Sequence, residues 1–355
     1  MKILIPILGT FGKAGGWRVL SQLANYWLKE GHDVSFLVHK SSANPYFPTA
    51  AGLIYYDNEG KISSAPDTSE SLPKFGAIIL RSALRKAVDK VSADVLLANQ
   101  SFTALPVAKS KNPARKFYYI QAYEPDYYYK QNVKDFIYKN ISRSSYKLPL
   151  EKIVNSPMYL NYKEIQTDKF VFPGLDLDVF KPVKHMTKSD IYILGTIGRL
   201  EEYKGTSYIV ESFKNLRAEL GNSIELHIAF GDPSLTQIDG IKIFNPRGDE
   251  ELAAYYNSLD AYICAGTIQL GAVHYPVIEA MACKIPVITT GYLPADSTNA
   301  WIIPVRDSEA ITKAVKKVKE EDVEEKVEKA YHDIQIFRWE QVAAKMLNYF
   351  STKVK

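Results

Sequence analysis

Cysteine is scarce in this sequence, with only Cys264 and Cys283 among 355 residues. Two cysteines cannot build the disulfide framework that stabilises many secreted domains, so we expect a protein of the reducing cytoplasm. Long apolar runs are also missing, because no run approaches the roughly 20 residues that a membrane-spanning helix needs. The sequence therefore argues against an integral membrane protein and allows only peripheral contact with the inner face of a membrane.

Two motifs of nucleotide-binding enzymes are absent as well. The first glycine-rich loop, GTFGKAGG at residues 9–16, does not match GxGxxG, and the next strand-like run ends in His39 and Lys40 where a ribose-binding acid would be expected. These absences argue against a nicotinamide dehydrogenase. No DxD-like metal motif stands out either, since DLD at residues 176–178 lies in a predicted hinge and DEE at 249–251 lies near a helix start. We expect no metal site and no resident cofactor.

The charge of the chain is modest but uneven. The formal net charge is +4, from 44 Lys and Arg against 40 Asp and Glu. Residues 1–174 hold 23 Lys and Arg against 14 Asp and Glu, a balance of +9, whereas residues 175–355 hold 21 against 26, a balance of −5. The basic first half favours an anionic surface or substrate, although a solvated basic face explains it equally well. No nucleic-acid-binding motif accompanies the charge, so we expect no nucleic acid partner.

Strand-like and helix-like runs alternate along the chain in two series. The first series opens with KILIPIL and the second with IYILGTIG near residue 191. Alternation of this kind is typical of parallel α/β sheets with helices on both faces. We therefore predict two Rossmann-like, doubly wound domains that face each other across a cleft, with a C-terminal helix. The predicted parts are a first domain at 1–174, a hinge linker at 175–190, a second domain at 191–335 and a C-terminal helix at 336–355.

Glycines and cations occupy the loops where such sheets bind ligands. Gly15 and Gly16 precede the first predicted helix, where backbone N–H groups can approach an anion; a tight strand-to-helix turn is the alternative. Arg199 and Lys204 follow a strand of the second series, in GTIGRLEEYKG at 195–205. Two cations beyond the carboxyl end of a strand suit a diphosphate. Surface ion pairs with neighbouring glutamates are the alternative.

Glu279 lies where a loop leads into a predicted helix that starts near Tyr275 and Pro276. We expect its carboxylate in the first helical turn. There it would gain about 0.3–1 kcal/mol from the helix dipole. It can also accept hydrogen bonds from both hydroxyls of a ribose, facing the same crevice as Arg199 and Lys204.

Several segments together resemble a known family. PGLDLDVFKP at 173–182, GRLEEYKG at 198–205 and VIEAMACKIPVITT at 277–290 are similar to the signature of nucleotide-sugar glycosyltransferases of the GT-B fold. Family 4, which comprises retaining enzymes, is the closest match. The resemblance implies sugar transfer from a UDP-, GDP- or dTDP-linked donor to a carbohydrate or glycolipid acceptor, without a metal.

The resemblance also assigns roles to residues. It implies that Arg199 and Lys204 hold the donor diphosphate and that Glu279 binds the nucleotide ribose. It further implies that Gly15 and Gly16 let the first loop approach the donor. His274 and Tyr275 belong to the donor-binding loop, although the family commonly has small or apolar residues there.

The sequence departs from the family pattern at two places. A second glutamate, which normally contacts the transferred sugar, is replaced by Gly271, with Gln269 as the nearest polar residue. In the first domain, QAYEPD stands where a His-Asp pair is common. Tyr123, Glu124 and Asp126 are therefore the candidates for acceptor binding, with Glu124 orienting or deprotonating an acceptor hydroxyl; packing in the core is the alternative.

These departures are similar to the rhamnosyltransferase branch, which uses dTDP-rhamnose, and another hexose donor is the alternative. A different class of function also stays open, namely a non-catalytic GT-B protein that binds nucleotide-sugar or partners an active enzyme.

A basic set of residues in the first half could touch anionic lipid, or could simply be solvated. The set comprises Arg81, Arg85, Lys86, Lys90 and the segment KSKNPARK at 109–116.

Overall fold

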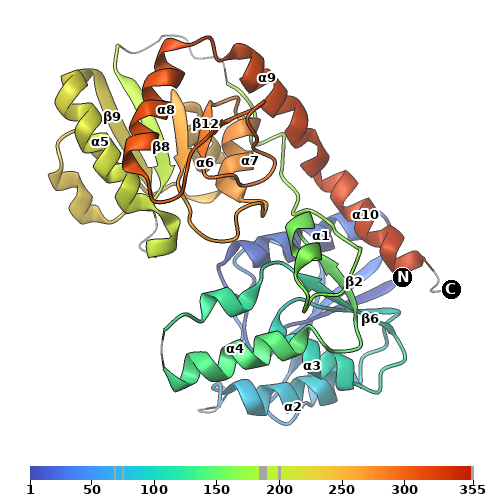
Figure 1. Ribbon diagram of the computed structural model, residues 1–355. Coiled ribbons are helices and arrows are strands. Elements are labelled where there is room, and N and C mark those ends of the chain that lie inside the picture. Colours follow the sequence, from blue (N-terminus) through green and yellow to red (C-terminus); the bar gives the residue numbers. More distant parts are fainter. Residues whose placement is uncertain (68, 74–75, 131, 184–189, 199–200, 353–355) are drawn as a thin grey trace. The chain divides into compact units, whose positions relative to one another are not determined.

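The protein divides into two compact α/β units (Figure 1). The computed structural model describes residues 1–67, 69–73, 76–130, 132–183, 190–198 and 201–352. Met1–Gly174 and Trp339–Lys355 form the first unit, and Leu175–Arg338 form the second. Each unit has a mainly parallel sheet with helices on both faces. This confirms the predicted fold class.

The first unit is built on a seven-stranded sheet in the order β4-β3-β2-β1-β5-β6-β7. All neighbouring strands are parallel except β3 and β4. The strands are β1 (Lys2–Pro6), β2 (Asp33–His39), β3 (Gly52–Tyr56), β4 (Ile62–Ser63), β5 (Val95–Ala98), β6 (Arg115–Ile120) and β7 (Glu151–Val154). The helices are α1 (Gly15–Lys29), α2 (Gly76–Val88), α3 (Ser101–Lys109), α4 (Val133–Ser145) and α10 (Trp339–Ser351), with short 3₁₀ turns η1 (Glu124–Tyr127) and η2 (Pro157–Asn161).

Two groups of helices cover this sheet. α2, α3 and α4 pack side by side, and α1 packs against α10 (Figure 1). The apolar residues of α1 recur at helical spacing, and Leu20, Leu23 and Trp27 are fully buried. Trp27 Nε1 donates to the carbonyl of Ala343 at 3.2 Å, and its ring lies 5.5 Å from that of Phe350. The C-terminal helix therefore completes the core of the first unit.

The second unit is built on a six-stranded, all-parallel sheet in the order β10-β9-β8-β11-β12-β13. The strands are β8 (Tyr192–Ile197), β9 (Ile224–Ala229), β10 (Ile241–Phe244), β11 (Ala261–Cys264), β12 (Val287–Thr289) and β13 (Trp301–Ile302). The helices are α5 (Thr206–Leu220), α6 (Gly248–Asn257), α7 (Tyr275–Ala282), α8 (Ser308–Glu320) and α9 (Glu324–Asp333), with 3₁₀ turns η3 (Glu202–Lys204), η4 (Gly221–Ser223), η5 (Pro233–Gln237) and η6 (Ile334–Phe337).

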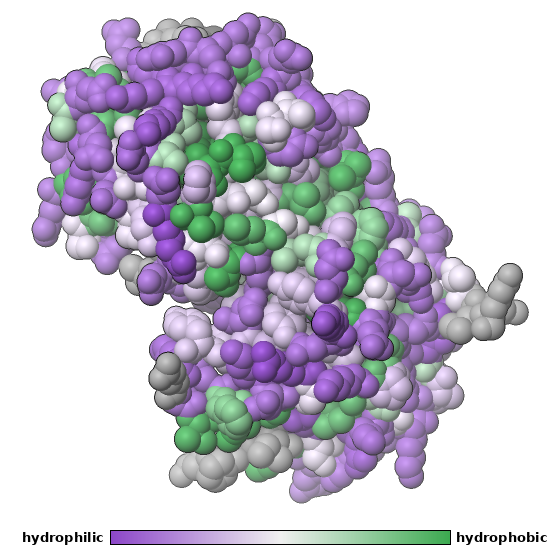
Figure 2. Space-filling view, viewed as in Figure 1, coloured by the Kyte–Doolittle hydropathy of each residue, from purple (hydrophilic) through white to green (hydrophobic). Residues whose placement is uncertain are grey.

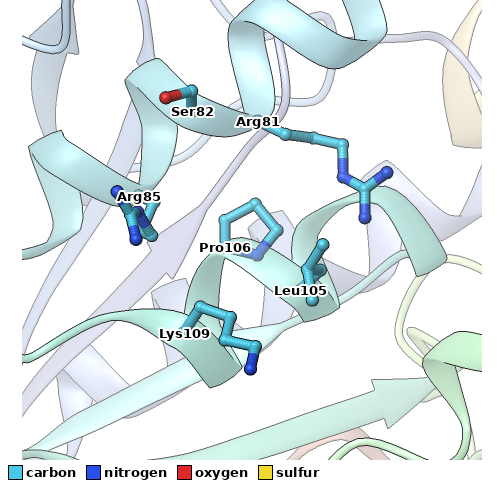
Figure 3. Close-up of a pocket in the computed structure, with 6 residues that line it drawn as sticks. All are labelled: Arg81, Ser82, Arg85, Leu105, Pro106 and Lys109. Atoms are coloured by element: carbon cyan, nitrogen blue, oxygen red, sulfur yellow. The ribbon is translucent and has the colours of Figure 1, made fainter.

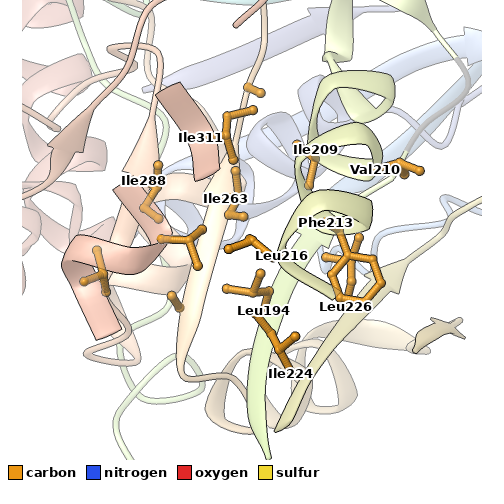
Figure 4. Packing of buried hydrophobic residues seen from close by; sticks show 14 of the residues in the cluster. Leu194, Ile209, Val210, Phe213, Leu216, Ile224, Leu226, Ile263, Ile288 and Ile311 are labelled. Carbon is orange, nitrogen blue, oxygen red and sulfur yellow. The ribbon is translucent and has the colours of Figure 1, made fainter. Parts of the chain in front are cut away.

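One hydrophobic core of the second unit lies between its sheet and the pair α5 and α8 (Figure 4). Leu194 of β8, Phe213 of α5 and Ile311 of α8 are at most 1% exposed within it. The lysines of α8 point the other way, and hydrophilic side chains cover the outer side of α8 and α9 in Figure 2. Among the described residues, no helix combines the length and the apolar character that crossing a bilayer requires.

The chain passes between the units twice, at residues 174–175 and 338–339. Residues 175–183 of the predicted hinge group with the second unit, and residues 184–189 lie outside the described part of the chain. The predicted C-terminal helix at 336–355 is divided, because η6 ends at Phe337 in the second unit and α10 begins at Trp339 in the first.

Trp27→Ala should loosen α10 specifically. Replacing a buried Trp by Ala typically costs about 3–5 kcal/mol. The lost side chain here contacts Phe350 and holds the Ala343 carbonyl. Amide hydrogen exchange should therefore accelerate in α10, whereas α8 of the second unit serves as the internal control. Unchanged exchange in α10 would show that Trp27 does not hold this helix.

Candidate active site

The second sheet has one place where its strand order reverses. From β8 the chain proceeds outward to β9 and β10, and then returns to β11 on the other side of β8. The loops that leave the carboxyl ends of two such strands diverge to opposite faces, which opens a crevice where α/β proteins bind ligands. In this unit the described parts of the two loops are residue 198 with residues 201–205, after β8, and residues 265–274, after β11.

Close backbone contacts tie these two loops together. Thr267 N donates to the carbonyl of Tyr203 at 2.9 Å. Gly205 has φ of +73°, and a Cβ atom added there would lie 2.0 Å from the carbonyl oxygen of Ala265. Only glycine tolerates both the left-handed backbone and this approach. The loops therefore behave as one structure that holds the side chains between them.

Lys204 and His274 meet at this crevice. Lys204 Nζ lies 3.4 Å from His274 Nε2, and His274 Nδ1 lies 3.6 Å from Cys264 Sγ. The imidazole also stacks on the ring of Tyr292, with 4.7 Å between the ring centroids. His274 is the N-cap residue of α7, so the cation of Lys204 stands near the positive end of that helix. Two sources of positive potential at one point favour an anionic ligand.

Arg199, the other cation predicted for this loop, lies outside the described residues. Its predicted position beside Lys204 therefore stays a prediction.

Glu279 lies on α7 and is only 2% exposed. Tyr256 of α6 donates its hydroxyl to Glu279 Oε2 at 2.9 Å. The pKa of Tyr256 is raised well above its ordinary value by burial and by the neighbouring carboxylate. Burial and Glu279 together also raise the pKa of Cys283 to about 12. A carboxylate in such a place requires hydrogen-bond partners, because a buried unpaired charge is costly.

The predicted position of Glu279 in the first helical turn was wrong. α7 begins at Tyr275, so Glu279 is the fifth helical residue and gains little from the end of the helix. It follows Tyr275 by four residues and thus lies on the same side of α7. Helical side chains as a rule lean toward the N-terminus of their helix, and the N-terminus of α7 is where Lys204 and His274 meet.

The loop before α7 holds the backbone at positions 269 and 271 in the left-handed conformation. Gly271 has φ of +84° and donates its N–H to the carbonyl of Gly291 at 2.9 Å. A glutamate would have to adopt the same left-handed backbone. Gln269 already does so, with φ of +51°. Non-glycine residues in this conformation are found mainly at functional sites. The backbone of Gln269 therefore supports a functional role for the loop.

The first sheet reverses its order between β1 and β5. Gly15 and Gly16 form the first turn of α1, after the loop that leaves β1, and the N-cap Ala14 provides no side-chain cap. A Cβ atom at Gly16 would lie 3.2 Å from the side chain of Gln121, which follows β6. The glycines thus lie at the edge of the sheet where the sequence predicts an approach to an anion.

Glu124 lies at the same edge of the first sheet and is held by α3. Its carboxylate accepts hydrogen bonds from Ser101 N, at 2.8 Å, and from Ser101 Oγ. Its own N–H donates to the hydroxyl of Tyr146 at 3.1 Å. Burial raises the pKa of Glu124, and the hydrogen bonds from Ser101 oppose that rise. Gln100 is the N-cap of α3 and forms a capping box with Thr103, and Glu124 adds an acceptor for the first helical residue, Ser101, a structural task that the sequence did not reveal.

The other two acceptor candidates differ from each other in their surroundings. Tyr123 donates its hydroxyl to Glu164 Oε2 and stacks on Tyr146, with 5.6 Å between the ring centroids. Burial and the contact with Glu164 raise the pKa of Tyr123 to about 12, so it remains a neutral donor. Asp126 is exposed in the 3₁₀ turn η1.

Three residues of the second unit that support the site were missed in the sequence. Tyr256 bonds Glu279, Tyr292 stacks on His274, and Gly205 permits the contact between the loops. Gly205 lies in the quoted motif GRLEEYKG, so its glycine character was a usable signal. Nothing in the local patterns of the two tyrosines pointed to their partners, which are distant in sequence.

Residues 191–321 match the family model described as glycosyl transferases group 1. No curated protein sequence matches the chain. Three similar solved structures illustrate the fold. Sucrose-phosphate synthase from Thermosynechococcus elongatus has a TM-score of 0.77 at 17% identity, covering 98% of both chains. Anabaena HepE, in complex with UDP and glucose, has a TM-score of 0.72 at 15% identity, covering 99% of this chain and 100% of that one.

WaaG, a glycosyltransferase involved in lipopolysaccharide biosynthesis, has a TM-score of 0.71 at 16% identity, covering 99% of this chain and 100% of that one. The family match covers the unit that contains Lys204, His274 and Glu279, and the structural matches cover nearly the entire chain. Residues 191–321 are therefore similar to the glycosyl transferases group 1 family, and the chain has the two-domain GT-B fold of these solved structures.

Proposed function

We propose that the protein transfers a sugar from a nucleotide-diphosphate-sugar to a carbohydrate or glycolipid acceptor, with retention of configuration at the anomeric carbon and without a metal. The contact between Lys204 and His274 at the start of α7 carries this proposal. It concentrates positive charge at the crevice of the second sheet. Glu279, one turn further along the same helix, suits the ribose hydroxyls of the same donor.

The proposed chemistry breaks the bond between the anomeric carbon and the β-phosphate oxygen. The acceptor hydroxyl forms its bond to the anomeric carbon on the same face, and its proton passes to the departing nucleoside diphosphate. Negative charge develops on that diphosphate as the bond breaks. Lys204 and the N-terminus of α7 would stabilise this charge, and preorganised groups of this kind usually make the largest contribution to catalysis. Arg199 would act in the same way.

The identity of the sugar is a finer part of the proposal, for which dTDP-rhamnose is the first candidate. Rhamnose is a 6-deoxy sugar and lacks a hydroxyl that a glutamate could otherwise bind. The glycine backbone at Gly271, where that acid would stand, agrees with such a donor. UDP-linked hexose is the alternative, because the similar HepE structure contains UDP and glucose.

The acceptor is proposed to bind at Tyr123, Glu124 and Asp126, and Gly15 and Gly16 are proposed as donor-binding residues. Tyr123 supplies an aromatic face and Asp126 an exposed carboxylate. Glu124 would orient the acceptor hydroxyl while it accepts hydrogen bonds from Ser101.

Peripheral contact with an anionic membrane from the cytoplasmic side is also proposed. Among the exposed residues of α4 are Val133, Phe136 and Ile137, and Lys134 lies between them. Figure 2 shows hydrophobic side chains at this part of the first unit. Apolar side chains beside a cation suit a bilayer surface that carries negative charge. Binding to phosphatidylglycerol vesicles, but not to phosphatidylcholine vesicles, is the expected result.

The donor class is tested by adding UDP, GDP, ADP or dTDP, and their sugars, in a thermal-shift panel. A ligand at a hundredfold excess over its dissociation constant should stabilise the native protein by about 2.7 kcal/mol. A nucleotide-sugar that binds but is never turned over, with any acceptor, would favour the non-catalytic alternative. Stabilisation by UDP compounds alone would contradict dTDP-rhamnose.

Lys204→Ala should lower the rate of sugar transfer, or of donor hydrolysis, by about 10²–10³-fold. The loss of one preorganised group that stabilises developing charge typically raises the barrier by about 2.7–4 kcal/mol. Lys214→Ala is the matched control, because Lys214 is an exposed lysine of the neighbouring α5. If the two variants turn over the donor equally, Lys204 does not bind the diphosphate.

Glu279→Gln should weaken the preference for a ribose over a deoxyribose. The test compares the affinities of UDP and 2′-deoxy-UDP for the wild type and the variant by calorimetry. If the donor is a ribonucleotide such as a UDP-sugar, a carboxylate that accepts both ribose hydroxyls should favour UDP by about tenfold or more, since a hydrogen bond to a charged group contributes about 1.5–3 kcal/mol. A dTDP-linked donor has a 2′-deoxyribose, offers Glu279 only its 3′ hydroxyl and predicts no such preference. Tyr256→Phe, which leaves the carboxylate in place without its donor, is the companion variant. Equal discrimination in the wild type and Glu279→Gln would exclude a contact between Glu279 and the 2′ hydroxyl, and equal affinity of both proteins for UDP itself would exclude the ribose role.

Glu124→Gln separates the two tasks of that residue. Gln retains an acceptor for Ser101, so the variant should remain folded, whereas Glu124→Ala should lose about 1–3 kcal/mol because Ser101 N–H loses its acceptor. Because burial raises the pKa of Glu124, its ionisation opposes folding as pH rises. The stability of Glu124→Gln relative to the wild type should therefore improve as the pH rises above the ordinary pKa of a glutamate and level off above the raised pKa of Glu124.

Transfer by Glu124→Gln should fall by about tenfold or more if the carboxylate orients the acceptor, because that contact is charge-assisted. Donor binding should not change. Full transfer activity in this variant would leave Glu124 with only its structural task.

A further inference from the structure

A cavity of about 300 Å³ opens between α2 and α3 of the first unit (Figure 3). Its lining residues are Arg81, Ser82 and Arg85 from α2, and Leu105, Pro106 and Lys109 from α3. The close-up shows the three cationic side chains arranged around Leu105 and Pro106. The cavity is built from helices, so its shape does not depend on a loop.

The three cations of this cavity have no acidic partner among the described residues. No ion pair of Arg81, Arg85 or Lys109 occurs there, although Asp89 follows Arg85 by one helical turn. Asp89 instead accepts a hydrogen bond from Lys111 N at 2.6 Å. The positive charges of these side chains repel one another. A bound anion would attract each of them and so offset that repulsion.

Arg81 distinguishes this cavity from an ordinary solvated basic surface. Its Nε atom is buried and has no hydrogen-bond partner. Burial alone lowers the pKa of its guanidinium. A buried donor without a partner is costly, so such an atom in a native protein calls for an explanation. A ligand oxygen that accepts from the planar guanidinium would provide one.

We infer that the cavity between α2 and α3 is a binding site for a phosphate mono- or diester. Arg81, Arg85 and Lys109 would hold the phosphate oxygens, and Leu105 and Pro106 would contact the organic part of the ester. The volume lies at the lower end of the range of small-molecule sites, which suits a phosphate with a short polar or glycerol-like group. The cavity contains none of the residues assigned to donor or acceptor binding. A test of phosphate binding in the cavity is therefore independent of whether the proposed transfer reaction occurs.

Two sources supply this chemistry, a soluble phosphate ester and the headgroup of a phospholipid. The soluble source is tested by calorimetry with glycerol 3-phosphate. The lipid source is tested by co-sedimentation with vesicles of phosphatidylcholine, with or without phosphatidylglycerol. Binding in the first experiment alone assigns a soluble ester, and pocket-dependent binding in the second assigns a lipid headgroup.

The test compares two double variants of the full chain. Arg81→Gln with Lys109→Gln removes two charges from the cavity. Lys86→Gln with Lys111→Gln removes two charges from exposed positions nearby that do not line the cavity. The cavity variant should lose about tenfold or more in affinity, because hydrogen bonds from charged donors are lost, and the control variant should stay within about twofold of the wild type.

Two results would overturn the inference. One is an equal loss in both double variants, which would indicate a diffuse basic surface. The other is no binding of glycerol 3-phosphate or of phosphatidylglycerol vesicles by the wild type. The melting temperature of the cavity variant is the control for folding, because an unchanged value shows that the variant is folded and has lost only its binding. We expect this temperature to be unchanged or higher, since the variant has fewer positive charges that repel one another.

Discussion

The site of the second unit depends on the contact between two loops that leave adjacent strands. Gly205 and Ala265 approach so closely that no side chain fits between them, and Thr267 bonds the carbonyl of Tyr203. This contact places Lys204, on one loop, against His274, at the end of the other. The cation and the helix N-terminus are thereby brought together before any ligand arrives. Such preorganisation spares the protein a reorganisation cost during reaction.

The fold and the general location of the site could be predicted from the sequence, because both follow from local patterns. The strand-like run that ends at His39 is β2 of the structure, and the loop after IYILGTIG contains Lys204. The environment of each side chain could not be predicted in this way. Glu279 is bonded to Tyr256 and Glu124 to Ser101, and both partners lie 23 residues away in sequence. The spacing of apolar and polar residues along the sequence does not reveal contacts between residues that are this far apart.

Buried carboxylates recur in both units with different surroundings. Glu124 meets a helix N-terminus, which favours its ionised form against the effect of burial. Glu279 meets the hydroxyl of Tyr256, which donates to the carboxylate and becomes harder to ionise itself. In each unit the acid is thus held by a group from a neighbouring helix. The helix packing of the core and the chemistry of the candidate site cannot be altered independently.

The assignment of α10 to the first unit has a consequence for biosynthesis. Residues of the second unit are all made before residue 339, whereas the partner of Trp27 lies at Ala343 and Phe350. On the ribosome, the second unit is therefore complete while the first still exposes an apolar helix face that was synthesised more than 300 residues earlier. Domains that are continuous in sequence usually fold as they emerge. In this chain a helix that is made after the whole second unit closes the core of the first unit.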